Sequence, residues 1–105
     1  MNEKMNFEQF RNDFELKLSS ITEFELQEYH FEPHSFGNGI LAYRIKGVNH
    51  KFIFDGRENE LTWLVSKHHE KYFGANFTEL RSFDGLLINK AEIEKEIKNR
   101  TQQGI

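Results

Sequence analysis

Hydrophobic residues near the start of the chain recur at helical spacing. They are three or four positions apart, which places them on one face of a helix. The run comprises Phe7, Phe10, Phe14, Leu18 and Ile21. Asn6 precedes it and Gln9 follows three positions later, which is the spacing of a capping box. The pattern predicts a helix over about residues 6–19.

The middle of the chain changes to the alternation that is typical of β-strands. Apolar and polar residues alternate in four segments separated by short turns that contain glycine. These segments are 23–32, 40–46, 51–55 and 61–66. In the first segment the apolar side changes at Gln27-Glu28, where we expect a β-bulge. Pro33 follows and cannot donate a ladder hydrogen bond, which favours an edge position for this strand. We expect a four-stranded antiparallel meander.

The last third of the sequence predicts two helical segments. A short helix is expected at about 77–83, because Asn76 and Glu79 repeat the capping-box spacing and Gly85 is a common helix stop; a fifth strand is the alternative, since this segment also alternates. A longer helix follows Asn89, with its last residues, 101–105, frayed. The order predicts one α+β domain over residues 1–105, with the helices packed on one face of the sheet.

Composition and charge limit the classes of protein to consider. The chain has no cysteine, which excludes disulfides and thiolate metal sites, and no apolar run approaches the ~20 residues of a membrane span. We therefore expect a cytoplasmic protein with no membrane partner. The formal charge is −3, which disfavours duplex DNA binding. Acidic residues dominate positions 1–32, where eight oppose three basic ones.

Histidines and carboxylates are the candidate groups for metal binding or catalysis. His30, His34, His69 and Glu70 could in principle converge on zinc. Pro33 excludes a helical pair of the first two, and no helical zinc motif is present, so exposed histidines in loops and turns are the favoured interpretation. No serine lies in the glycine-flanked turn of a nucleophile elbow. We expect no metal, no cofactor and no catalytic residues; a small histidine-dependent enzyme or metal-binding protein is a further alternative.

The alternation also separates rings from charges in the middle of the chain. Tyr43 and Trp63 share their faces with aliphatic residues and are expected in the core. The opposite face is expected to carry aliphatic and basic groups that could contact a partner. The predicted binding residues are Arg44, Lys46, Lys51, Ile53 and Arg57.

The function that this pattern favours is a non-catalytic binding module acting through protein–protein interaction. The layout is similar to that of small adaptor, inhibitor or immunity-type proteins, which are often acidic. The alternative is a single-stranded nucleic-acid-binding protein that uses the basic and aromatic residues of the sheet. A homodimer is a further arrangement to consider, because Ile40, Ile53 and Leu64 would share the uncovered face.

Overall fold

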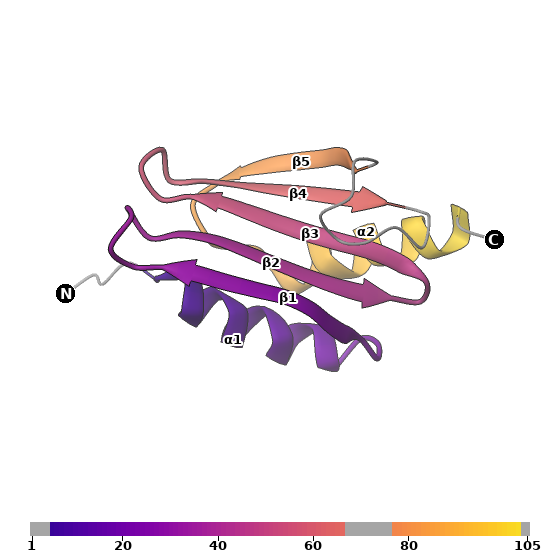
Figure 1. The fold of residues 1–105 in the computed structure, drawn as a ribbon. Helices are drawn as coiled ribbons and strands as arrows, with labels where there is room; N and C mark the ends of the chain where they lie inside the picture. The colour runs from indigo at the N-terminus through magenta and orange to yellow at the C-terminus, as the bar shows by residue number, and fades with distance from the viewer. Residues whose placement is uncertain (1–4, 67–76, 104–105) are drawn as a thin grey trace.

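Two helices and five strands make up the part of the chain that the computed structural model describes, residues 5–66 and 77–103 (Figure 1). The elements in chain order are α1 (Phe7–Ser19), β1 (Glu25–Glu32), β2 (Asn38–Ile45), β3 (Val48–Asp55), β4 (Glu60–Ser66), β5 (Thr78–Asp84) and α2 (Lys90–Gln103). The strands form one antiparallel sheet in the order of the sequence, β1-β2-β3-β4-β5. Both helices lie on the same side of this sheet (Figure 1). The α+β class and the placement of the helices are confirmed.

The expected strand count was too low by one. The segment predicted as a short helix at 77–83 is strand β5, which pairs with β4 along its length. The backbone groups of this segment are satisfied by the ladder with β4 rather than by a helical turn. Gly85 ends the element with φ at +99°, and its N–H donates to the carbonyl of Asn59. Gly85, whose position suggested the end of a helix, therefore ends a strand. The proposed partner in the capping pair, Asn76, lies outside the described residues.

Helix α1 begins and packs as its sequence predicts. Asn6 is the N-cap, and a capping box with Gln9 is present in both directions, each bond 2.8 Å long. The side chains of Phe7, Phe10 and Phe14 are each 1% exposed. They stack along the helix and meet the rings of the sheet, with Phe14 4.8 Å from Phe52 between ring centroids. Aromatic pairs at such spacings contribute beyond the area they bury, so this row of rings is the main contact between α1 and the sheet.

The irregularity predicted in the first strand is present. The register of β1 against β2 shifts between Leu26 and Glu28, which places a β-bulge at Gln27. After the bulge Tyr29 and Phe31 face the helices, where both contact the ring of Phe7. β1 is an edge strand, as expected from the proline that follows it. The bulge keeps the aromatic side chains inward on both sides of the phase change.

Helix α2 is held to the sheet by a narrow apolar stripe and by charge pairs. Its N-cap is Asn89, whose side chain accepts from the N–H of Glu92 at 2.8 Å. Ile93 and Ile97 are buried, whereas Ala91 is exposed. Arg81 of β5 reaches α2, with ion pairs of 3.0 Å to Glu92 and 3.7 Å to Glu96. Neither described helix is long and apolar enough to cross a membrane.

A polar contact also ties α1 to the sheet. The hydroxyl of Tyr43 donates to Oε2 of Glu15 at 2.9 Å, and Nε of Arg11 donates to the same oxygen at 2.9 Å. Burial, together with the negative charge of Glu15, raises the pKa of Tyr43 well above its ordinary value. The neutral hydroxyl is therefore the form that the fold stabilises.

Gly39 in β2 is a test of the packing between α1 and the sheet. A Cβ at this position would overlap the ring of Phe7. We expect Gly39→Ala to lower the free energy of unfolding by about 1–3 kcal/mol, because the ring must move within a packed core. Urea unfolding with an NMR spectrum of the Phe7 ring measures both effects. The control is Gly47→Ala, where nothing lies near the new methyl but φ is +82°. This control should cost about 1–2 kcal/mol and leave the Phe7 resonances in place.

The Tyr43 contact predicts loss of stability at alkaline pH. The pKa of Tyr43 is raised in the folded state, so above the unfolded value of 10.0 the unfolded chain releases a proton that the folded chain keeps. Stability should then fall by up to about 1.4 kcal/mol per pH unit. Tyr43→Phe should cost about 1–2 kcal/mol at neutral pH and flatten this decline. Urea titrations between pH 8 and 11 test it; an equally steep decline in the variant would contradict it.

Candidate functional site

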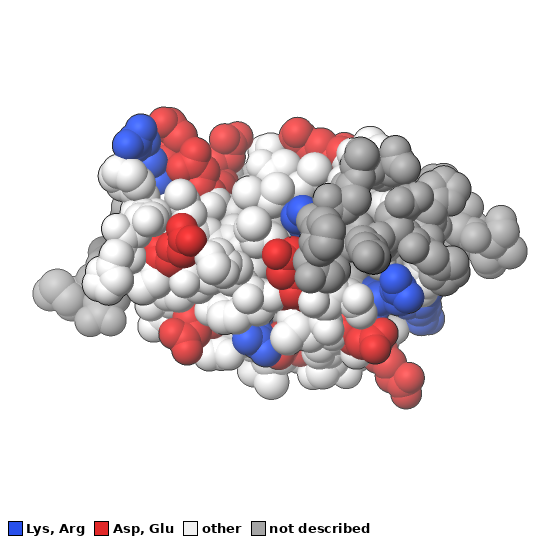
Figure 2. Space-filling model, in the orientation of Figure 1, with Lys and Arg blue, Asp and Glu red and all other residues white. Residues whose placement is uncertain are grey.

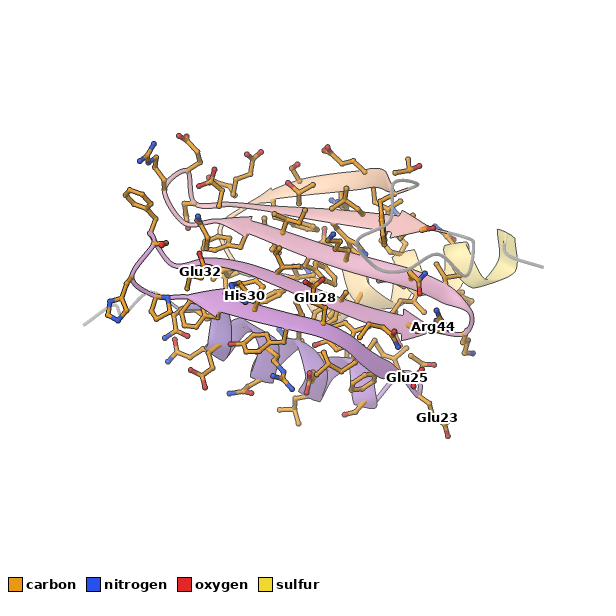
Figure 3. The ribbon with its side chains drawn as sticks, in the orientation of Figure 1. Glu23, Glu25, Glu28, His30, Glu32 and Arg44 are labelled. Carbon is orange, nitrogen blue, oxygen red and sulfur yellow. The ribbon has the colours of Figure 1, made fainter. Side chains whose placement is uncertain are left out.

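The face of the sheet turned away from the helices is the candidate functional site, here called the open face. Its members follow from the strand register, because residues paired across strands point to the same side. Leu41, Tyr43, Phe52 and Trp63 are 0% exposed and face the helices, so the residues between them point outward. The open face is viewed directly in Figures 2 and 3, where α1 and α2 lie behind the sheet.

Apolar side chains run across the centre of the open face. Ile40 pairs with Ile53, and the neighbouring row contains Ala42, Lys51 and Leu64. Ile53 is 38% exposed, and Ile40 and Leu64 are half-buried. Figure 2 shows uncharged residues over much of the visible part of this face, interrupted by single acidic and basic residues. An apolar centre with a polar surround is the usual arrangement of a protein-binding surface.

Carboxylates surround this apolar centre. Seven acidic residues of the described strands point to the open face, against two basic ones, Arg44 and Lys51. The acidic residues are Glu25, Glu28, Glu32, Asp55, Glu60, Glu79 and Asp84. Those of β1 follow one edge, as the labelled Glu25, Glu28 and Glu32 show in Figure 3. The face is therefore acidic, although the residues of β2 and β3 alone would make it look basic.

Two features of these carboxylates are unfavourable for the isolated chain. Glu60 of β4 pairs directly with Asp55 on one side and with Asp84 on the other, so three acidic residues lie in one row across three strands. Like charges directly opposite each other destabilise a sheet. On β1, Oε1 of Glu28 is buried and has no hydrogen-bond partner among the described residues. A buried acceptor left without a partner costs stability.

Three of the five predicted binding residues lie on the open face. Ile53 is at its centre, and Lys51 places its ammonium group 5.3 Å from the ring centroid of Phe77. Arg44 lies opposite Glu25 in the register and donates from Nε to Oδ1 of Asn49 at 3.1 Å. The side chains of Lys51 and Arg44 thus each contact a neighbouring group of the protein. These two charges do not form the continuous basic strip that single-stranded nucleic acid requires.

Lys46 is placed differently from the prediction. It occupies the β2–β3 turn with φ at +52°, where alternation no longer applies. It borders a hollow of about 490 Å³ on the helix side of the molecule. The walls of this hollow include Ile21, Thr22, Lys95 and Lys98. Lys46 is therefore removed from the open face, because a positive-φ turn redirects the side chain.

Arg57 lies in the β3–β4 loop, where it covers an exposed ring. Its guanidinium is 4.3 Å from the ring centroid of Phe36, which lies in the β1–β2 loop and is 61% exposed. Phe36 has φ at +61°, a conformation that is strained for a bulky side chain. Lys46 and Asn59 are the other described non-glycine residues with positive φ, and asparagine tolerates this conformation. A strained aromatic held in solvent is a candidate contact residue.

The two loops hold each other at this end of the sheet. The N–H of Gly56 donates to Oδ1 of Asn38 at 2.7 Å, and Oδ1 of Asp55 accepts from the N–H groups of Arg57 and Glu58. Gly56 lies against the carbonyl oxygen of Phe36, where any Cβ would overlap it. Glycine is therefore required at this close approach. The loops, and the strand ends that carry Asn38 and Asp55, form one rigid unit.

The structure gives no support to a metal site in the part of the chain it describes. No group of three or more potential ligands comes together there. His30 instead makes a 2.8 Å contact with Glu32 on the open face. His69 and Glu70, which were considered with it, lie outside the described residues.

Comparison of the chain with protein-family models, with curated proteins and with solved structures gives no match.

The acidic character of the open face was not predicted from the sequence. The outward residues of the middle strands were combined neither with those of β1 nor with those of β5, which was expected to be helical. The period-two pattern of β5 and the phase change at the bulge together contain the missing signal, because they assign Glu28, Glu32 and Asp84 to the same face as Ile53. Phe36 gave no signal, since positive φ at a phenylalanine is not expected.

Because the backbone of Phe36 is strained, replacing this residue is expected not to lower the free energy of unfolding. Asparagine adopts positive φ more readily than phenylalanine, and the exposed ring loses little burial. We expect Phe36→Asn to leave the free energy of unfolding unchanged or to raise it by about 1 kcal/mol, measured by urea unfolding. Phe31→Asn, at a half-buried ring that contacts Phe7, should cost about 2–4 kcal/mol. A loss of more than about 1 kcal/mol in Phe36→Asn would show that the ring serves the fold.

Proposed function

We propose that this protein is a non-catalytic binding module that acts through its open face on a partner protein. The partner surface would be basic and partly apolar. The observation that carries this proposal is the combination of an exposed apolar centre, around Ile53, with an excess of carboxylates around it. Opposite charges at the rim of an interface favour encounter and fix orientation, while the buried centre supplies most of the affinity.

Unfavourable features of the free protein also support this function. The repulsion around Glu60 and the unpaired oxygen of Glu28 weaken the isolated sheet. A basic partner would relieve the repulsion between Glu60 and its two neighbours. Residues that break a local rule of stability are expected where function requires them. Phe36 and Arg57 add an exposed ring and a cation at one end of the same surface, both residue types that carry binding energy in interfaces.

The nucleic-acid alternative has less support. Phosphate backbones are attracted by continuous positive charge, whereas the described strands turn seven acidic residues and two basic ones to the open face. Tyr43 and Trp63, the rings that could stack on bases, are fully buried on the helix side. A homodimer through the open face would bring two acidic surfaces together, which disfavours it at low salt.

Photocross-linking in living cells tests this proposal. A photoreactive phenylalanine analogue replaces Ile53 in the full chain, and the same analogue replaces Leu16, which is 73% exposed on α1, as the control. We expect an adduct with one protein at position 53 and not at position 16. The captured protein is then purified, and its affinity is measured for the wild-type chain and for Glu60→Lys.

Glu60→Lys should weaken binding about tenfold or more and should not lower stability, because the new lysine lies between two carboxylates. The matched control is Glu94→Lys on the exposed side of α2, which should bind as the wild type does. Affinity that is unchanged in Glu60→Lys, an adduct with a second copy of this chain, or an adduct with nucleic acid at position 53 would each contradict the proposal.

A further inference from the structure

A hollow of about 360 Å³ lies on the open face, near the end that carries the two loops. It is bordered by residues of the first three strands. They are His30 and Glu32 of β1, Asn38, Gly39 and Ile40 of β2, and Ile53, Phe54 and Asp55 of β3. At this end β2, between its two neighbours, turns the short side chain of Asn38 to the open face, whereas Gly39 faces Phe7 in the core. Its size is at the small end of the range for ligand sites in proteins.

The walls of the hollow differ in chemistry along its length. Ile40 and Ile53 pair with each other across β2 and β3 and give it an apolar part. In the other part of the hollow, Glu32 pairs with Asn38, and Asp55 lies next to Asn38. Two carboxylates, those of Glu32 and Asp55, therefore border this part. The side chain of Glu32 is half exposed and contacts Nε2 of His30. An apolar wall that ends at two acids matches a side chain with an aliphatic stem and a cationic end.

The carboxylate of Asp55 is held in place before any ligand arrives. Its Oδ1 accepts two N–H groups of the β3–β4 loop, from Arg57 and Glu58, at 3.0 Å and 3.3 Å. Asn38 is fixed in the same way by the N–H of Gly56. Both anchored side chains border the hollow. Groups fixed in advance lose less conformational entropy when they bind.

We propose that this hollow is the subsite of the open face that receives a basic side chain, lysine or arginine, of the partner protein. The aliphatic stem packs on Ile40 and Ile53, and the ammonium or guanidinium group is bound by Glu32 and Asp55. The subsite rests on the proposed protein-binding function, and it names the chemistry that the partner must present. Its position beside Phe36 and Arg57 makes it continuous with the exposed ring at this end.

NMR titration with small probes tests the subsite without a partner protein. The full chain, with its isoleucine methyl groups labelled, is titrated at low salt with Nα-acetyl-lysine methylamide and, separately, with Nα-acetyl-arginine methylamide. We expect saturable shifts of the methyl groups of Ile40 and Ile53, with dissociation constants of about 1–30 mM. The two titrations decide between lysine and arginine. Nα,Nε-diacetyl-lysine methylamide has the same stem without the charge, and should shift these groups at least tenfold more weakly.

Variants locate the binding groups. Glu32→Gln and Asp55→Asn each keep the shape of the side chain, and Asp55→Asn keeps an oxygen that can accept from the loop N–H groups. Each should weaken binding of the charged probes about three- to tenfold. Glu94→Gln on α2 is the matched control and should change nothing. The methyl groups of Ile21, a half-buried residue beside the hollow on the helix side, should show no saturable shift.

The possible results separate this subsite from the wider function. If neither charged probe shifts Ile40 and Ile53, or if diacetyl-lysine shifts them equally, the subsite is wrong. A partner cross-linked at position 53 whose affinity is lost in Glu60→Lys would still support the proposed function in that case. If the probes bind here but no partner is found through the open face, the proposed function fails, and the hollow remains only a site for a cationic side chain. Shifts that survive in Asp55→Asn combined with Glu32→Gln would also overturn the assignment.

Discussion

The packing of both helices against one face of a five-stranded sheet is the constraint on which the rest of this structure depends. The three phenylalanines of α1 and the inward residues of β2, β3 and β4 form one continuous core. Because the sheet has two faces and the described helices cover one, each strand must leave every second residue without a helix above it. Packing against the described helices therefore does not determine which residues occupy that second face, and function can.

Register decides what that second face contains. The bulge at Gln27 lets β1 keep Tyr29 and Phe31 in the core while it turns Glu28, His30 and Glu32 outward. Pairing of β5 with β4 adds Asp84 beside Glu60. Hence one irregularity at one edge and one additional strand at the other change the face from mildly basic to acidic. The electrostatic character of the molecule depends on strand pairing as much as on composition.

Much of the fold could be read from the sequence, and the exceptions have physical causes. α1, the four first strands, the bulge, the edge position of β1 and the cap of α2 at Asn89 follow from periodicity and capping residues, which are local signals. The segment at 77–83 carried signals for both helix and strand, and pairing with β4, a non-local contact, decided between them. Lys46 departed from the alternation because a positive-φ turn redirects it. In the candidate site, the sequence assigned Ile53, Arg44 and Lys51 to the correct face. The position of most of the carboxylates on that face could not be predicted, because it depends on the pairing of β1 and β5. The conformation of Phe36 could not be predicted either, because it depends on the contact between two loops.

Several features that lower the stability of the chain lie on the face that the helices leave uncovered or at one end of it. Core positions satisfy packing: Trp63 is buried and donates to Nδ1 of His50 at 3.1 Å. By contrast, the carboxylate row around Glu60, the unpaired oxygen of Glu28 and the strained Phe36 all lie on or beside the open face. The helix side has departures of other kinds, since Lys46 has φ at +52° and Leu16 is 73% exposed. Several of its charged groups are paired, as in the contacts of Arg81 with α2 and of Arg11 with Glu15. The repelling carboxylates and the unpaired oxygen of Glu28 are the physical reason to propose binding at the open face, because selection for stability alone would have removed them.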